Sequence, residues 1–148
     1  MPSVELTLDV AAPADRVWAA VVDIERYPES MKNVRWVEIR EQLGPDERRS
    51  GWSIVLKGSI LEWEEREDLD HENRIMSFHQ LSGDLDIFDG RWVVEEKGPE
   101  LTAVSFHVRF EASPSNEWSR TWSASSCQGV FNGSIRGSSA ISPPTRRW

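Results

Sequence analysis

Alternating hydrophobic and polar positions dominate the first 111 residues. The first run covers residues 4–10, with the apolar side chains Val4, Leu6, Leu8 and Val10 at every second position. This period is typical of a strand with one buried face. Similar runs occur at 34–41, 51–57, 60–67, 75–81, 85–94 and 101–110. Short polar turns separate most of them, so the pattern predicts a sheet of about seven antiparallel strands.

A short helical region follows the first strand. Pro13 suits the first turn of a helix, where its missing N–H costs nothing. One face of the next two turns is apolar, with Val17, Trp18, Val21 and Val22. Pro28 breaks a second helical stretch within 23–31. We therefore predict an α+β fold in which a short helix pair packs on a curved antiparallel β-sheet.

The segment from Arg74 to Glu96 is predicted to be a hairpin within this sheet. Ser82, Gly83 and Asp84 supply its turn. Gly90 interrupts the second strand, and an interior strand glycine marks a bulge, a bend or the close approach of another backbone. We expect the concave face of the curved sheet to hold the functional site. Covering that face would require a long amphipathic helix after residue 110.

Residues 112–148 do not show the pattern of that helix. They contain ten serines in 37 positions and are punctuated by prolines and glycines. Three interpretations stay open: a disordered tail, an irregular segment docked on the sheet, or the product of a shifted reading frame. We therefore divide the chain into a sheet-and-helix unit, 1–111, and an atypical Ser/Arg/Trp-rich segment, 112–148. If the concave face is left uncovered, its apolar side chains predict self-association.

Composition and charge exclude several classes of function. The net charge of -8 argues against binding to nucleic-acid phosphates. No apolar run approaches the roughly 18 residues of a membrane span, and the start of the chain lacks the features of a signal peptide. A cytoplasmic location is the resulting expectation. The single cysteine, Cys127, and three histidines without metal-ligand spacing lead us to expect no metal and no cofactor.

Several short motifs resemble those of the START-like helix-grip (SRPBCC) superfamily. Residues 12–18 are similar to its A-P-x-x-x-V-W helix start, and residues 23–28, DIERYP, to its D-x-x-x-Y-P motif. Further motifs at 62–63, 73–75, 83–84 and 90–92 resemble the branch of polyketide cyclases/dehydrases and coenzyme Q-binding proteins. The likeness covers about residues 3–111.

This resemblance implies a cavity that binds a hydrophobic small molecule, such as a polyketide, a quinone or a lipid. It implies a polyketide cyclase-like role in polyketide biosynthesis and, if the protein is an enzyme, one that needs no cofactor. Two alternatives stay open: a non-catalytic quinone or lipid carrier, and a protein-interaction module on the same fold. The arginine and tyrosine used by related cyclases fall on Glu67 and Val34 here.

Candidate site residues lie on the predicted strands. His79 and Arg91 are candidates for catalysis, because a neutral imidazole can shuttle protons and an arginine can orient a ligand. The alternative for both is a solvent-facing strand position. A flat ligand suits an aromatic wall, for which the candidates are Trp36, Trp52, Trp63, Phe78, Phe88 and Trp92. The alternative for these rings is the ordinary filling of a small core. The acidic run 62–70 is interpreted as a solvated strand end and turn.

Overall fold

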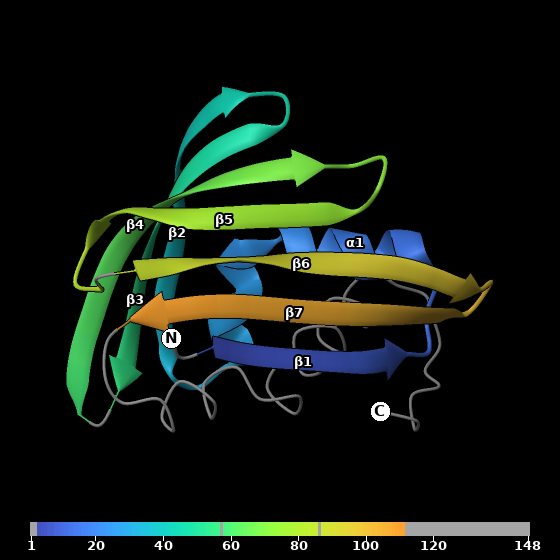
Figure 1. Cartoon of the computed structure of the whole chain (residues 1–148), viewed down its shortest axis with the longest axis horizontal. Coiled ribbons are helices and arrows are strands. Elements are labelled where there is room, and N and C mark those ends of the chain that lie inside the picture. The colour runs from blue at the N-terminus through green and yellow to red at the C-terminus, as the bar shows by residue number, and fades with distance from the viewer. Residues whose placement is uncertain (1–2, 57, 86, 112–148) are drawn as a thin grey trace.

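The computed structural model of the chain describes residues 3–56, 58–85 and 87–111 (Figure 1). The expectations for residues 112–148 lie outside these described residues. The described part contains a helix pair and a seven-stranded sheet, which confirms the predicted α+β fold. Its elements are β1 (Ser3–Val10), α1 (Ala14–Val22), the 3-10 helix η1 (Ile24–Glu29), β2 (Val34–Gly44), β3 (Glu47–Leu56), β4 (Ser59–Asp70), β5 (Ile75–Gly83), β6 (Ile87–Gly98) and β7 (Leu101–Glu111).

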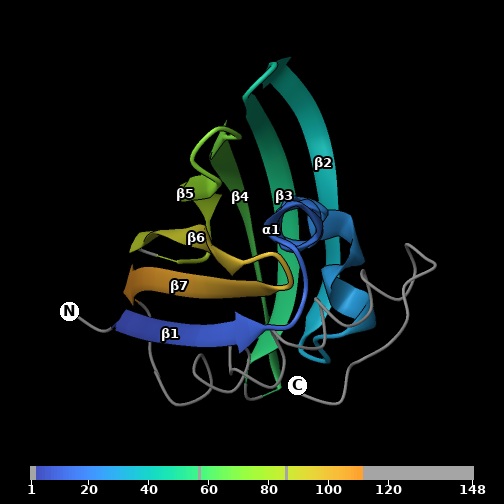
Figure 2. The same cartoon turned by 90° about the vertical axis from the view of Figure 1, so that its right-hand side faces the viewer.

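The sheet is antiparallel throughout, in the order β1-β7-β6-β5-β4-β3-β2. Strands β2 to β7 therefore follow one another as hairpins, and β1 pairs with the last strand. Figure 2 shows that the sheet bends strongly, so that β2, β3 and β4 stand across the direction of β1, β6 and β7. Helix α1 lies inside this bend, on the concave side of the sheet.

Strands β2 and β3 are longer than the apolar pattern predicted. The predicted runs end at 41 and resume at 51, but the ladder continues through the pair Gly44 and Glu47, leaving only a two-residue turn. The added length is polar and is held across the strands, for example by the ion pair of Arg49 with Glu41 at 3.1 Å. Such a ribbon is stabilised by backbone pairing and charge, so hydrophobic alternation does not mark it.

We call the concave side of the sheet the inner face. It is defined by the buried aromatic side chains Trp52, Trp63, Phe78, Phe88, Trp92 and Phe106. The helix pair packs against it through Tyr27, which is fully buried. The Tyr27 hydroxyl donates a hydrogen bond of 2.7 Å to the carbonyl oxygen of Val21. Its ring meets those of Trp52 and Trp92 edge-on, at centroid distances of 5.7 and 6.2 Å.

Gly90 lies where the backbones of β6 and β7 come close together. A Cβ atom at this position would overlap the carbonyl oxygen of His107 and lie 2.8 Å from the Cα of Val108. Both neighbours are backbone atoms, which cannot move without distorting the sheet. Of the three structural reasons considered for this glycine, the close approach of another backbone is the one that the structure shows.

We predict that Gly90→Ala destabilises the protein by about 2 kcal/mol or more, because the added methyl group meets rigid backbone. Gly44→Ala is the matched control, since no atom lies within 4 Å of a Cβ at that position. It should change the free energy of unfolding by no more than about 0.5 kcal/mol. Urea unfolding of both variants measures the difference. Equal stability of the two variants would contradict the close approach.

Candidate functional site

The inner face carries a continuous wall of aromatic rings. Trp52 on β3 and Trp63 on β4 are direct cross-strand partners, and their indoles stack at 5.8 Å with planes 6° apart. Phe88 packs against Trp63 at 4.9 Å and against Phe78 at 5.3 Å. Phe106 extends the wall beside Phe78 at 6.2 Å. Rings from five strands thus form one apolar surface.

A cavity of about 10 Å³ lies within this wall. The described residues that line it are Trp52, Glu65, Met76, Phe78, Phe88, Trp92 and Phe106. Glu65 is the one titratable side chain in that set. The volume suits about one water molecule, whereas small-molecule pockets measure about 300 Å³ or more. A larger ligand therefore requires the groups around the cavity to move.

A buried polar chain leads from the helix to the neighbourhood of this cavity. The guanidinium of Arg48 donates one hydrogen bond from Nη2 to the carbonyl oxygen of Val22, at 2.8 Å, and another from Nε to Oε1 of Glu67, at 2.5 Å. The hydroxyl of Ser50 donates to Oε2 of Glu67 at 2.8 Å, and Trp52 Nε1 donates to that hydroxyl at 2.9 Å. Both oxygens of Glu67 are therefore satisfied, and its charge is paired.

Glu65 is the second carboxyl group of this cluster and is 2% exposed. Trp63 Nε1 donates a hydrogen bond of 2.9 Å to its Oε1. Burial is the main cause that raises the pKa of Glu65 well above its usual value, and the hydrogen bond and charge of Glu67 raise it further. Arg48 is already paired with Glu67. The arrangement therefore favours an ionised Glu67 beside a neutral, protonated Glu65.

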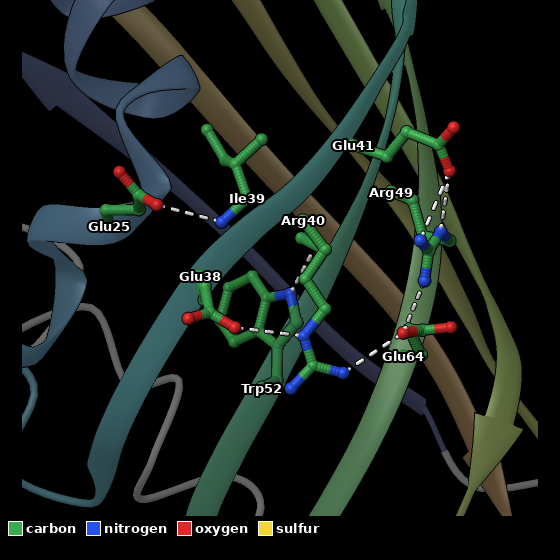
Figure 3. A network of polar contacts seen from close by, with 9 residues as sticks. Glu25, Glu38, Ile39, Arg40, Glu41, Arg49, Trp52 and Glu64 are labelled. Carbon is green, nitrogen blue, oxygen red and sulfur yellow. Dashed lines mark hydrogen bonds and ion pairs between the residues drawn. The ribbon is translucent and has the colours of Figure 1, made fainter.

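The next residue of the same strand has the opposite environment. Glu64 points to the outer, convex face, where Arg40 and Arg49 donate hydrogen bonds of 3.0 and 2.7 Å to its Oε2 (Figure 3). The hydrogen bond from Arg40, and then that from Arg49, lowers the pKa of Glu64. Adjacent glutamates on β4 thus differ in charge state because a strand sends successive side chains to opposite faces.

The same alternation separates the predicted site residues into two groups. Five of the six predicted aromatic residues come together on the inner face: Trp52, Trp63, Phe78, Phe88 and Trp92. Trp36 lies on the outer face of β2, beneath the guanidinium of Arg40 at 5.6 Å. His79 and Arg91 are exposed, each next in sequence to an inward aromatic residue. The structure does not bring these three residues to the aromatic wall.

The most distinctive polar groups of the inner face were missed in the sequence. The run 62–70 was interpreted as solvated, and that is wrong for Glu65 and Glu67, both of which are buried. The alternation of a strand was the available signal, because these two glutamates share one face with Trp63 and Leu69. Arg48, the direct cross-strand partner of Glu67, could not be recognised before the β3–β4 register was known.

A metal centre and a membrane-spanning helix are not found in the described part of the chain. Within residues 3–56, 58–85 and 87–111, no group of three or more histidine, cysteine, aspartate or glutamate side chains could hold a metal ion. No helix in those residues is long and apolar enough to cross a membrane.

Comparison with known proteins agrees with the motifs and the fold. The model of the family described as polyketide cyclase / dehydrase and lipid transport matches residues 10–120. A curated relative, the granaticin polyketide synthase bifunctional cyclase/dehydratase of Streptomyces violaceoruber, is 36% identical over 108 residues, which is 72% of this chain. The match covers 33% of that protein, so the chain spans about a third of its length.

Solved structures with the same fold cover nearly the whole chain. A protein of Thermus thermophilus matches with a TM-score of 0.80 and 27% identity, over 93% of this chain and 100% of that one. The ZhuI aromatase/cyclase of a Streptomyces species matches with a TM-score of 0.77 and 23% identity, over 94% and 96%. A START superfamily protein of Mycobacterium smegmatis matches at 0.67 and 17%, over 91% and 94%. These likenesses confirm the helix-grip fold.

We predict that Glu65→Gln changes how stability depends on pH. Glu65 keeps its proton in the folded state, whereas in the unfolded chain it ionises near its ordinary pKa. Above that ordinary pKa, Glu65 therefore lowers the free energy of unfolding of the wild type by about 1.4 kcal/mol per pH unit, until folded Glu65 also ionises. The variant lacks this loss, so its stability relative to the wild type should rise with pH. Urea unfolding at several pH values measures the trend.

Glu64→Gln is the control for that prediction and should show the opposite trend. The folded-state pKa of Glu64 is lowered, so ionised Glu64 stabilises the folded protein above the unfolded pKa. This stabilisation is lost as the pH falls. Relative to the wild type, this variant should lose stability as the pH rises from acid towards neutral. Parallel trends for the two variants would contradict the assigned charge states.

We predict that Arg48→Met destabilises the protein by about 3–5 kcal/mol, because it leaves the charge of Glu67 buried without a partner. Adding Glu67→Gln to this variant should restore most of the loss, since no buried charge then remains. Arg66→Met is the control on the outer face, where the side chain is 37% exposed, and should cost about 1 kcal/mol or less. A double variant as unstable as Arg48→Met alone would argue against the paired charges.

Proposed function

Because the chain belongs to the polyketide cyclase/dehydrase and lipid transport family, we propose that it binds a hydrophobic aromatic or poly-β-ketone molecule against the inner face of its sheet. The observation that carries this proposal is the aromatic wall. Trp52 and Trp63 stack with planes 6° apart, and Phe88 lies 4.9 Å from Trp63. A flat ring system can pack on such a wall through offset and edge contacts.

The polar content of the wall fits the same kind of ligand. Binding sites for small molecules are mostly apolar and use a few placed polar groups to fix the ligand's orientation. Among the described lining residues, Glu65 is such a group. In a ring-closing enzyme, a site of this kind holds a flexible chain in a reactive conformation and assists proton transfer. The chemistry needs no cofactor.

The name of the curated relative supports cyclisation or dehydration as the reaction class. The chain spans about a third of that relative, so its reaction enters here as part of the proposal. A carrier that binds a quinone or a lipid without converting it, and a module that binds another protein, are the alternatives from the sequence. No contact of the described residues favours either one. The cytoplasmic location remains a prediction.

We predict that the wild-type protein binds a hydroxylated anthraquinone saturably, as measured by equilibrium dialysis. Phe88→Leu removes the ring that contacts both Trp63 and Phe78 and should weaken binding about two- to tenfold, the value of one aromatic contact. Trp36→Phe alters an aromatic residue of the outer face and should leave the affinity unchanged. Circular dichroism checks that both variants are folded.

Two outcomes of this experiment would contradict the proposal: no saturable binding by the wild type, or equal losses in the two variants. Incubation of the protein with a poly-β-ketone, followed by mass spectrometry, then separates enzyme from carrier. Ring closure with loss of water lowers the ligand mass by one water molecule, whereas a carrier returns the ligand unchanged.

A further inference from the structure

The buried cluster at the aromatic wall contains two carboxyl groups and one cation. Arg48 pairs with Glu67, whose other oxygen accepts a hydrogen bond from Ser50. Glu65 lies next to this pair and is 2% exposed. A second ionised carboxylate there would be desolvated, would repel Glu67 and would have no cation of its own among the residues that the structure describes. The charge count therefore requires a proton on Glu65.

The contacts of Glu65 indicate which of its oxygens carries that proton. Oε1 accepts the hydrogen bond from Trp63 Nε1 at 2.9 Å and therefore acts as the carbonyl oxygen of the acid. The hydroxyl is then at Oε2. This hydroxyl is hydrogen-bonded to Glu67. If it turns to a ligand instead, both oxygens of Glu67 keep a hydrogen bond, because Arg48 and Ser50 donate to them. The O–H group of Glu65 is thus available to a ligand in the cavity that Glu65 lines.

We propose that Glu65 acts as a neutral carboxylic acid whose Oε2 hydroxyl donates a hydrogen bond to a keto oxygen of the bound ligand. This inference rests on the proposed function and names the ligand class that the site selects. A keto oxygen is a neutral acceptor and matches the single donor of a protonated carboxyl group. The same hydrogen bond polarises the carbonyl group towards attack by a carbon nucleophile.

The same cluster disfavours ligands that carry a carboxylate. Such a ligand would place a new negative charge beside Glu67, while Arg48 is the one cation among the described residues that acts on Glu65. Apolar and aromatic residues of β3, β5, β6 and β7 form the rest of the described lining: Trp52, Met76, Phe78, Phe88, Trp92 and Phe106. A desolvated anion without a cation is costly. The site should therefore prefer aromatic ketones to fatty acids and other lipid carboxylates.

The test compares two probes that differ only in their keto oxygens: a hydroxylated anthraquinone and the anthracene with the same hydroxyl groups. We expect the wild type to bind the keto probe about tenfold more tightly at neutral pH, the value of one buried hydrogen bond. Glu65→Leu should abolish this preference. Glu65→Gln should keep it, because the side-chain amide retains an N–H donor and can still accept from Trp63.

The pH profile separates proton donation from simple packing. In the wild type the preference should decline at alkaline pH, as Glu65 ionises and loses its donor. In Glu65→Gln it should stay constant over the same range. Glu62→Gln, on the outer face of the same strand, is the control and should behave like the wild type.

Three results would overturn the inference. A keto preference that survives Glu65→Leu assigns the donor elsewhere, and a wild-type preference that does not change with pH excludes a titrating acid. A carboxylate-bearing anthracene that binds the wild type as tightly as the anthraquinone would contradict the charge argument. Failure of the proposed function itself gives a different result, in which none of the probes binds to the wild type.

Discussion

In the described part of the chain, two carboxyl groups and one guanidinium share the interior of the bent sheet, and the chemistry of the inner face depends on how they divide their charge. Arg48 donates to Glu67 from the adjacent strand, and that pairing leaves Glu65 as the group that must stay neutral. Burying an ion pair is costly unless every hydrogen bond is made. Here the hydroxyl of Ser50 and the indole N–H of Trp63 complete the set, so the cluster can exist inside an aromatic core.

The aromatic wall and the cluster support each other. Trp52 and Trp63 supply apolar surface to the aromatic wall and also supply N–H groups to Ser50 and Glu65. The rings exclude water, which strengthens each electrostatic interaction between the polar groups. Arg48 also bonds the last residue of α1, Val22, so the helix that lies inside the bend is tied to the same cluster. Fold and site thus share their contacts, and a change at either one affects both.

Much of this could be predicted from the sequence, because a strand has a period of two. That period predicted the number of strands. The Gly90 interruption predicted a bulge, a bend or a close backbone contact, and the structure shows the close contact. The period of two did not show which polar residues are buried. Glu65 and Glu67 look like a solvated strand end until Arg48 is known to lie opposite Glu67. That position follows from the register of β3 on β4, which the sequence of either strand alone does not give. His79 and Arg91 were selected for residue type, and both alternate with inward aromatic side chains towards the outer face.

On this reasoning, Glu65 is a neutral acid inside the aromatic wall at neutral pH. Carbon-13 NMR of the glutamate side-chain carboxyl groups tests this charge state most directly, with the Glu65 signal assigned by its absence in the spectrum of Glu65→Gln. We expect this signal to keep the chemical shift of a protonated carboxyl group at pH 7. A Glu65 signal with the chemical shift of an ionised carboxylate at pH 7 would contradict the neutral acid.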